Sequence, residues 1–114
     1  MKEAIHPTRL LDDTIHQRVR LGLLAVLTEA DSADFTYLRD RLDLTDGNLS
    51  RHLQVLEQAG YVAIEKVTDG ARPRTWIHAT RRGRKAFTEH LERLQTIIDM
   101  AGGNTERTRR EDRK

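Results

Sequence analysis

The chain contains no cysteine, so it can form neither a disulfide nor a thiolate metal site. No stretch approaches the roughly 18 consecutive apolar residues that a membrane span requires. The first residues also lack the apolar segment of a secretory signal peptide. We therefore expect a cytoplasmic protein with no membrane partner and no need for an oxidising compartment.

Aromatic residues are scarce as well, at 4% of the chain. RNA-binding modules commonly stack bases on paired aromatic side chains, and the sequence shows no such pair. It also lacks the phosphate-binding glycine loop and the G-x-S-x-G and H-E-x-x-H motifs of common enzymes. The five histidines follow no familiar metal-ligand spacing. We therefore expect no enzymatic activity, no metal and no other cofactor.

Charged residues, in contrast, make up 33% of the 114 residues, although the net charge is only +2. Their distribution is uneven. Residues 1–50 carry six Lys/Arg and nine Asp/Glu, whereas residues 66–85 carry seven Lys/Arg and the single acid Asp69. Contact with a polyanion requires such a local excess of positive charge, although a merely solvated surface would also produce it.

Apolar residues recur at spacings of three and four in four segments, and each such segment predicts a helix. These segments are residues 13–30, 35–42, 46–59 and 81–100. Asp12 or Asp13 can cap the first helix, Ser32 or Asp34 can cap the second, and the hydroxyl of Thr45 can cap the third. Gly60 stands where a helix is expected to end, and Gly102-Gly103 is expected to end the last helix.

Between the third and fourth helices the pattern becomes that of strands. Residues 61–67 and 75–80 are β-prone, and the polar segment 68–74 between them is expected to be a loop. The predicted fold is mainly α with a small β-hairpin, in the order helix, helix, helix, strand, strand, helix. This order is that of a winged helix-turn-helix domain.

The chain divides into three parts on the same patterns. Residues 1–12 are expected to form an N-terminal arm and residues 13–102 a single folded domain. Residues 103–114 are expected to be a disordered basic tail, because the segment from Asn104 has no apolar residue to bury.

The second and third predicted helices are joined by about three residues, which is the pattern of a helix-turn-helix motif. The third helix would bury Leu49, Leu53 and Leu56 and leave its polar face for the major groove of DNA. Asn and Gln side chains can pair with adenine and Arg with guanine, while hydroxyls and backbone amides suit phosphate oxygens. The candidate DNA-binding residues of this helix are Thr45, Asp46, Gly47, Asn48, Ser50, Arg51 and Gln54.

Asp46 and Gly47 need separate interpretations. Asp46 would repel phosphate, so we interpret it as a capping residue or as a contact to cytosine. Gly47 has no side chain, so DNA could approach the helix backbone closely at that point.

The predicted hairpin supplies a second candidate contact. Arg72 and Arg74 flank Pro73, which restricts the local backbone. A guanidinium placed there could enter a narrow minor groove. Four basic residues at the start of the last helix would divide between phosphate contacts and solvent, namely Arg81, Arg82, Arg84 and Lys85.

Two segments carry a resemblance to a known family. LTDGNLSRHLQVLEQAGYVAIEK (residues 44–66) and GARPRTWIHATRRGRKAF (residues 70–87) resemble winged-helix regulators related to the multiple-antibiotic-resistance and arsenical-resistance repressors. The resemblance covers roughly residues 13–100. It implies a repressor that binds a pseudo-palindromic operator as a homodimer, through the third helix and through a wing at Arg72 and Arg74. The relatives usually have a proline after the histidine of the first helix, and its absence after His16 leaves the role of that residue open.

The last predicted helix is longer than one small core needs, and its apolar stripe continues beyond the hairpin. Such a stripe needs a partner, and a second copy related by two-fold symmetry is the usual one. The residues expected at this dimer interface are Leu10, Leu11, Leu91, Leu94, Ile97 and Ile98. A small-molecule effector, if the protein has one, would bind at the same interface.

A rival interpretation is a winged-helix module that binds another protein without sequence-specific contacts to DNA. Such a module would more often carry apolar residues on the exposed face of its third helix, whereas this face is polar and bears Arg51. We therefore favour a transcriptional regulator that binds double-stranded DNA.

Overall fold

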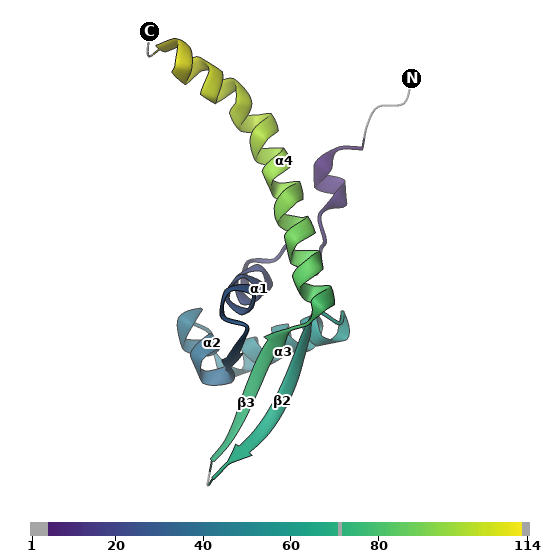
Figure 1. Ribbon diagram of the computed structural model, residues 1–114, viewed down its shortest axis with the longest axis vertical. Helices are drawn as coiled ribbons and strands as arrows, with labels where there is room; N and C mark the ends of the chain where they lie inside the picture. Colours follow the sequence, from purple (N-terminus) through teal and green to yellow (C-terminus); the bar gives the residue numbers. More distant parts are fainter. Residues whose placement is uncertain (1–4, 71, 113–114) are drawn as a thin grey trace.

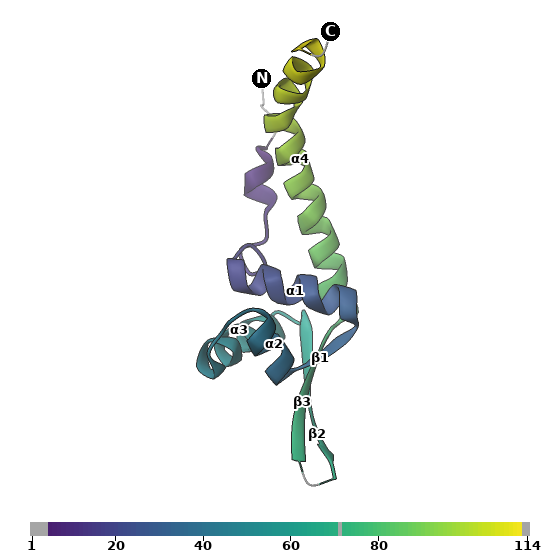
Figure 2. The same cartoon turned by 90° about the vertical axis from the view of Figure 1, so that its left-hand side faces the viewer.

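The computed structural model describes residues 5–70 and 72–112, and for residues 69 and 103–112 it describes the backbone only. Its elements are η1 (Pro7–Leu10), α1 (Arg18–Ala30), β1 (Ser32–Asp34), α2 (Phe35–Arg41), α3 (Asp46–Gln58), β2 (Val62–Asp69), β3 (Arg72–Ala79) and α4 (Arg81–Asp112). Three short helices form the body of the domain, the β2–β3 hairpin projects from one end, and α4 projects from the other (Figures 1 and 2). This arrangement confirms the predicted fold class. Within the described ranges, no helix combines the length and apolar character needed to cross a bilayer.

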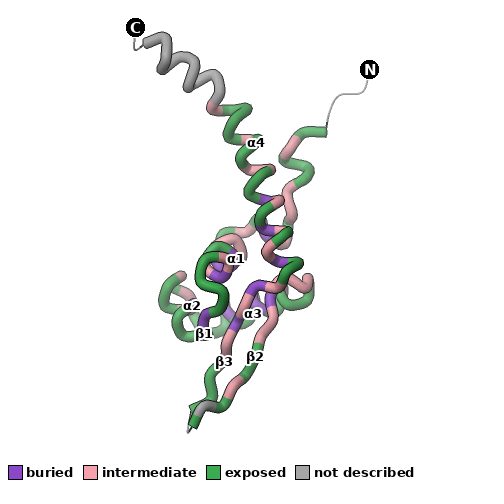
Figure 3. Tube along the Cα trace, viewed as in Figure 1, coloured by how far each residue is buried: buried purple, intermediate pink, exposed green. Residues whose placement is uncertain are grey.

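The hydrophobic core lies where α1, α3, the base of the hairpin and the first turns of α4 meet (Figure 3). Leucines dominate it, and full burial of one leucine side chain contributes about 1.5–3 kcal/mol. The fully buried apolar side chains are Ile15, Leu23, Leu24, Leu27, Leu38, Leu49, Leu56 and Ile77. The core therefore fixes α3 by the apolar stripe that the sequence predicted.

The caps of α2 and α3 are local and agree with the sequence. The side chain of Asp34 accepts a hydrogen bond from the backbone N–H of Tyr37 at 2.7 Å, and the hydroxyl of Thr45 accepts one from that of Asn48 at 3.1 Å. Gly60 follows α3 with φ +80°, a conformation that favours glycine.

The start of α1 differs from the prediction. The helix begins at Arg18, where the side chain of Gln17 accepts a hydrogen bond from the backbone N–H of Arg20 at 2.9 Å. Asp12 instead accepts a hydrogen bond from the N–H of Thr14 at 2.9 Å, which closes a separate turn. A helix beginning at Asp12 or Asp13 is therefore wrong, although Ile15 is buried as its spacing predicted.

The hairpin is longer and its turn tighter than expected. Asp69 pairs with Arg72, so only two residues connect the strands, and Gly70 has φ +68° as such turns require. The prediction of a loop over 68–74 is wrong, because Arg72–Arg74 belongs to β3. Pro73 is tolerated there because β1 pairs only with Trp76, Ile77 and His78, which leaves the outer part of β3 with one open edge.

Strand β1 is an addition to the predicted order. It is three residues long and pairs antiparallel with β3, giving a sheet in the order β1-β3-β2. A segment of this length is too short to show the alternation by which strands are predicted. Its last residue, Asp34, also caps α2, so the sheet sets where α2 begins.

Helix α4 also departs from the prediction, since it runs through Gly102-Gly103 to Asp112. Glycine lowers helix stability by only about 1 kcal/mol per residue, which is not enough to end a helix by itself. The end expected at Gly102-Gly103 is therefore wrong. The division into arm, domain and disordered tail stays a prediction, and residues 1–4 and 113–114 lie outside the described residues.

The first turn of α4 packs tightly against the backbone that follows α3. The N–H of Thr80 donates to the carbonyl of Tyr61 at 3.0 Å, and the Thr80 hydroxyl donates to the carbonyl of Gly60 at 2.6 Å. The same hydroxyl accepts a hydrogen bond from the N–H of Gly83 at 3.0 Å. A Cβ on Gly83 would overlap the carbonyl group of Tyr61. Only glycine therefore fits at position 83 without a shift of the backbone.

We expect Gly83→Ala to lower the free energy of unfolding by about 1–3 kcal/mol, because the methyl group would force α4 away from Tyr61. Chemical denaturation followed by circular dichroism measures this change. Gly102→Ala is the matched control, because no atom lies within 4 Å of its added Cβ. It should raise the free energy by up to about 1 kcal/mol through helix propensity. If Gly83→Ala left the free energy of unfolding unchanged or raised it, as Gly102→Ala should, the close packing of Gly83 against Tyr61 would be contradicted.

Candidate nucleic-acid interface

One face of α3 is exposed and polar along its whole length. Leu49, Leu53 and Leu56 are buried against the core. The predicted DNA-binding residues all lie on the exposed part of the helix and its cap, namely Thr45, Asp46, Gly47, Asn48, Ser50, Arg51 and Gln54. The structure thus brings them together on one surface, and their contact with DNA stays a prediction.

Asp46 forms an ion pair with a residue that the sequence did not single out. Nη1 of Arg39, on α2, donates to Oδ1 of Asp46 at 2.9 Å, and its Nε donates to Asp40 at 3.1 Å. The hydrogen bonds to Asp46 and Asp40 raise the pKa of Arg39, which keeps it charged. Thr45 rather than Asp46 is the cap, so the carboxylate of Asp46 instead connects the two helices of the motif.

Asn48 and Arg51 are also connected. Nη2 of Arg51 donates to Oδ1 of Asn48 at 2.9 Å, across one turn of α3. This bond orients the guanidinium along the exposed face and leaves its other N–H groups available to a ligand. Both side chains therefore point from the same patch of the helix, toward any partner that approaches it.

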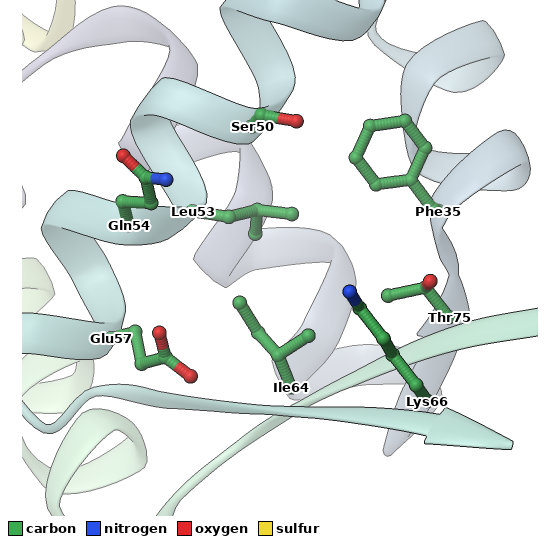
Figure 4. Close-up of a pocket in the computed structure, with 8 residues that line it drawn as sticks. All are labelled: Phe35, Ser50, Leu53, Gln54, Glu57, Ile64, Lys66 and Thr75. Atoms are coloured by element: carbon green, nitrogen blue, oxygen red, sulfur yellow. The ribbon is translucent and has the colours of Figure 1, made fainter.

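A cleft separates α3 from the hairpin (Figure 4). It has a volume of about 590 Å³, and Ser50 and Gln54 of α3 face Lys66 and Thr75 of the hairpin across it. Its other lining residues are Phe35, Leu53, Glu57 and Ile64. Sequence reasoning did not select Lys66 or Thr75 as contacts. Lys66 and Thr75 are directly opposite each other in the β2–β3 register, and opposite residues share a face of the sheet. A correct prediction of this register would have placed both residues on one face.

Arg72 and Arg74 are exposed near the tip of the hairpin. Because they are two residues apart on a strand, they lie on the same face, while Pro73 lies on the other. A smaller cavity of about 430 Å³ separates this part of β3 from the start of α2. The two arginines thus lie on a paired strand instead of the polar loop that the sequence predicted.

Two of the basic residues at the start of α4 are bound within the protein. Nη1 of Arg84 donates to the carbonyl of Thr28 at 3.2 Å, and its Nη2 lies 3.3 Å from Oδ1 of Asp31, beyond the end of α1. The guanidinium of Arg82 lies over the ring of Tyr61, 5.9 Å from its centroid. Arg84 is thus engaged within the protein, whereas the guanidinium of Arg82 stays exposed and charged.

His52 lies on the inner side of α3 and is half-buried. Nη1 of Arg20, near the start of α1, lies 3.1 Å from its Nδ1. Burial lowers the pKa of His52, and the charges of Arg20 and Arg51 lower it further. His52 is therefore neutral near pH 7 and anchors α3 to α1.

Comparisons with known proteins agree with this geometry. A family model described as a winged helix DNA-binding domain matches residues 19–98. A solved structure described as a transcriptional regulator homologue from Pyrococcus horikoshii OT3 is 32% identical, with 85% of this chain and 98% of that chain covered and a TM-score of 0.80.

Two curated proteins are also similar. An uncharacterized protein of Methanocaldococcus jannaschii is 41% identical over 73 residues, which cover 64% of this chain and 79% of that protein. A riboflavin kinase of Haloquadratum walsbyi is 40% identical over 61 residues, which cover 54% of this chain but only 24% of the kinase. The resemblance to winged-helix regulators is confirmed, and the chain belongs to the family of winged helix DNA-binding domains found in transcriptional regulators.

Proposed function

We propose that two copies of this chain bind a pseudo-palindromic operator in double-stranded DNA and repress transcription by occupying it. The observation that carries the proposal is the exposed polar face of α3, which lies beside a hairpin that bears Arg72 and Arg74 (Figure 1). Such a protein would act in the cytoplasm of a prokaryotic cell, where its DNA lies.

Helix α3 is the element proposed to enter the major groove. Asn48, Arg51 and Gln54 carry the donors and acceptors that distinguish base edges. Thr45 and Ser50 suit phosphate oxygens, as do the free N–H groups at the start of the helix. The ion pair with Arg39 offsets the charge of Asp46, which would otherwise repel the DNA backbone.

The hairpin is proposed to lie along the adjacent minor groove, with Arg72 and Arg74 toward the DNA. The sugar-phosphate strand that separates the two grooves would then cross the mouth of the cleft between α3 and the hairpin. Lys66, Thr75 and Ser50 line that cleft and supply one cation and two hydroxyls. This position of the strand is consistent with the concentration of positive charge after residue 66.

A second copy is proposed to cover the outer half of α4 and η1. Leu91 and Ile98 are 46% and 59% exposed, and Leu10 on the adjacent η1 is 47% exposed. The remaining interface candidates are half-buried, namely Leu11, Leu94 and Ile97. Apolar side chains gathered on a projecting element favour a partner, and a two-fold dimer would place two α3 helices on successive major grooves.

The exposed apolar residues also bear on the rival interpretation, a protein-interaction module. They lie mainly on α4 and η1, whereas the exposed face of α3 is polar. A protein partner would thus be expected at the proposed dimer interface, which leaves α3 for DNA. A small-molecule effector stays an expectation for the same interface.

We expect Arg51→Ala to weaken binding to an operator selected from genomic fragments by about 1–3 kcal/mol and to relax its sequence preference. Fluorescence anisotropy on the selected duplex and on single-base variants measures both effects. Arg18→Ala is the matched control, since Arg18 is an exposed arginine at the start of α1, outside α3, the hairpin and the proposed dimer interface. Equal losses of DNA affinity in the two variants would show that only the overall charge matters. The assignment of α3 as the helix that reads the bases would then be wrong.

We expect Arg72→Ala to reduce the dependence of binding on salt, because the side chain would no longer displace a counterion from phosphate. The slope of log K against log salt should fall by up to about 0.9 for each phosphate that the variant no longer neutralises. The slope of Arg18→Ala should match that of the unmodified chain. If the slope for Arg72→Ala equalled that of the unmodified chain, the proposal that the hairpin contacts DNA phosphates would be wrong.

We expect Leu91→Asp and Ile98→Asp to convert a dimer into a monomer, because each buries a charge in the proposed apolar interface. Sedimentation velocity at micromolar concentration measures the mass. Tyr37→Asp is the control, because Tyr37 is 50% exposed but lies on α2. If the unmodified chain sediments as a monomer, the dimer proposal is wrong.

A further inference from the structure

Two histidines meet where the N-terminal segment crosses α4. Nδ1 of His16 and Nε2 of His90 lie 3.2 Å apart, and their ring centroids are 5.2 Å apart. His90 has no exposed surface and is the single buried polar residue among those that the structure describes. His16 is exposed, so a proton from solvent can reach the pair.

The hydrogen bonds assign a neutral state to both rings. The backbone N–H of Asp12 donates to Nδ1 of His90 at 3.4 Å, so this nitrogen carries a lone pair. Nε2 of His90 must then carry the hydrogen and donate it to Nδ1 of His16. Each buried nitrogen has a partner only while the pair carries no extra proton.

An added proton breaks this pattern wherever it binds. On Nδ1 of His90 it would face the N–H of Asp12, and on Nδ1 of His16 it would face the N–H of His90. If His90 passed its own hydrogen to Nδ1, the clash with Asp12 would return. Each protonated form of this geometry therefore sets two donors against each other at a ring that has no exposed surface.

The groups around His90 shift its pKa in opposite directions. Burial lowers its pKa, His16 and Arg93 lower it further, and Asp12 opposes them. The Asp12 carboxylate is already engaged, because it accepts hydrogen bonds from the N–H of Thr14 and from the hydroxyl of Tyr61. Burial and Asp12 raise the pKa of Tyr61 to about 12, so its hydroxyl stays a donor. On α4, Glu89 lies 3.9 Å from Arg93.

The pair joins elements on which the proposed dimer depends. Asp12 and His16 follow η1, which lies alongside α4 (Figures 1 and 2). Leu10 of η1 and Leu91 of α4 belong to the proposed dimer interface. Asp12 also reaches Tyr61, just beyond the end of α3. Separation of the two histidines would thus loosen the interface and the support of α3 together.

We propose that the His16–His90 pair is a proton-operated latch, which holds residues 7–16 against α4 when neutral and releases them when it gains a proton. The latch stands on the contacts above. Its consequence, weaker dimerisation and weaker DNA binding in mild acid, rests on the proposed function.

The direction of the pH effect follows from linkage. Because the pKa of His90 in the folded chain lies below its ordinary value of 6.5, the unlatched or unfolded chain binds the proton more readily. The neutral pair therefore stabilises the closed form fully above pH 6.5, and this stabilisation declines as the pH falls below that value.

Hydrogen exchange and nitrogen-15 spectra of the histidine rings test the latch in the full chain, without DNA. Between about pH 7.5 and about pH 5.5, protection of the Asp12 amide should fall by up to about tenfold after correction for intrinsic exchange, as the ring signals of His90 titrate. His90→Asn removes the buried titratable ring and should show a smaller fall, whereas His78→Asn, outside the pair, should behave as the unmodified chain. Unchanged protection of Asp12 in the unmodified chain would overturn the latch, whether or not the variants fold.

Sedimentation and anisotropy on a duplex selected at about pH 7.5 test the consequence over the same range. We expect dimerisation and DNA binding to weaken by up to about tenfold for each chain in the unmodified protein and less in His90→Asn. His52→Gln is the critical control, because His52 lies on α3 and also has a lowered pKa. A pH response that disappears in His52→Gln would overturn the consequence. Absence of DNA binding at either pH would reject the proposed function, while the exchange measurement still decides the latch.

Discussion

The close contact between the first turn of α4 and the Gly60–Tyr61 backbone holds the functional parts of this domain in place. Thr80 donates hydrogen bonds to both carbonyls, and the absence of a side chain at Gly83 lets the helix approach. This short stretch of backbone ends α3, begins the hairpin and supports α4. The angle between the proposed DNA-reading helix and its wing is therefore set at the same point as the direction of the proposed dimer helix. A regulator that must place two α3 helices on one DNA molecule requires such a fixed relation.

Some basic residues of the domain make contacts within the protein, and others stay exposed and available to DNA. The sequence concentrates basic residues from Lys66 onward, but Arg84 is held by the end of α1. The cations left for DNA lie on the hairpin, on α3 and at the exposed positions of α4. Most of the electrostatic attraction would thus come from the hairpin side, and the choice of bases from α3, where Asn48 and Arg51 already orient each other.

Local interactions explain which features could be predicted from the sequence. The caps at Asp34 and Thr45 bind backbone groups three residues away, so the pattern predicted Thr45 and narrowed the α2 cap to Ser32 or Asp34. Asp12 looked like a similar cap, but its other oxygen accepts the hydroxyl of Tyr61, 49 residues later, and no local pattern carries that information. The roles of Arg84 and of the His16–His90 pair are equally non-local. Pro73 suggested a loop because proline is rare in strands, and only the limited pairing of β1 with β3 explains why β3 tolerates it.

The central claim is that a dimer reads DNA through α3 and touches the flanking minor groove through its hairpin. Hydroxyl-radical footprinting on a duplex selected from genomic fragments tests it most directly. The account predicts two symmetry-related protected segments whose centres are separated by about one helical turn, 10–10.5 base pairs, or a multiple of it. Protection should also extend to the minor grooves that flank the major grooves occupied by α3. A single protected segment without symmetry, or uniform protection along the duplex, would contradict the account.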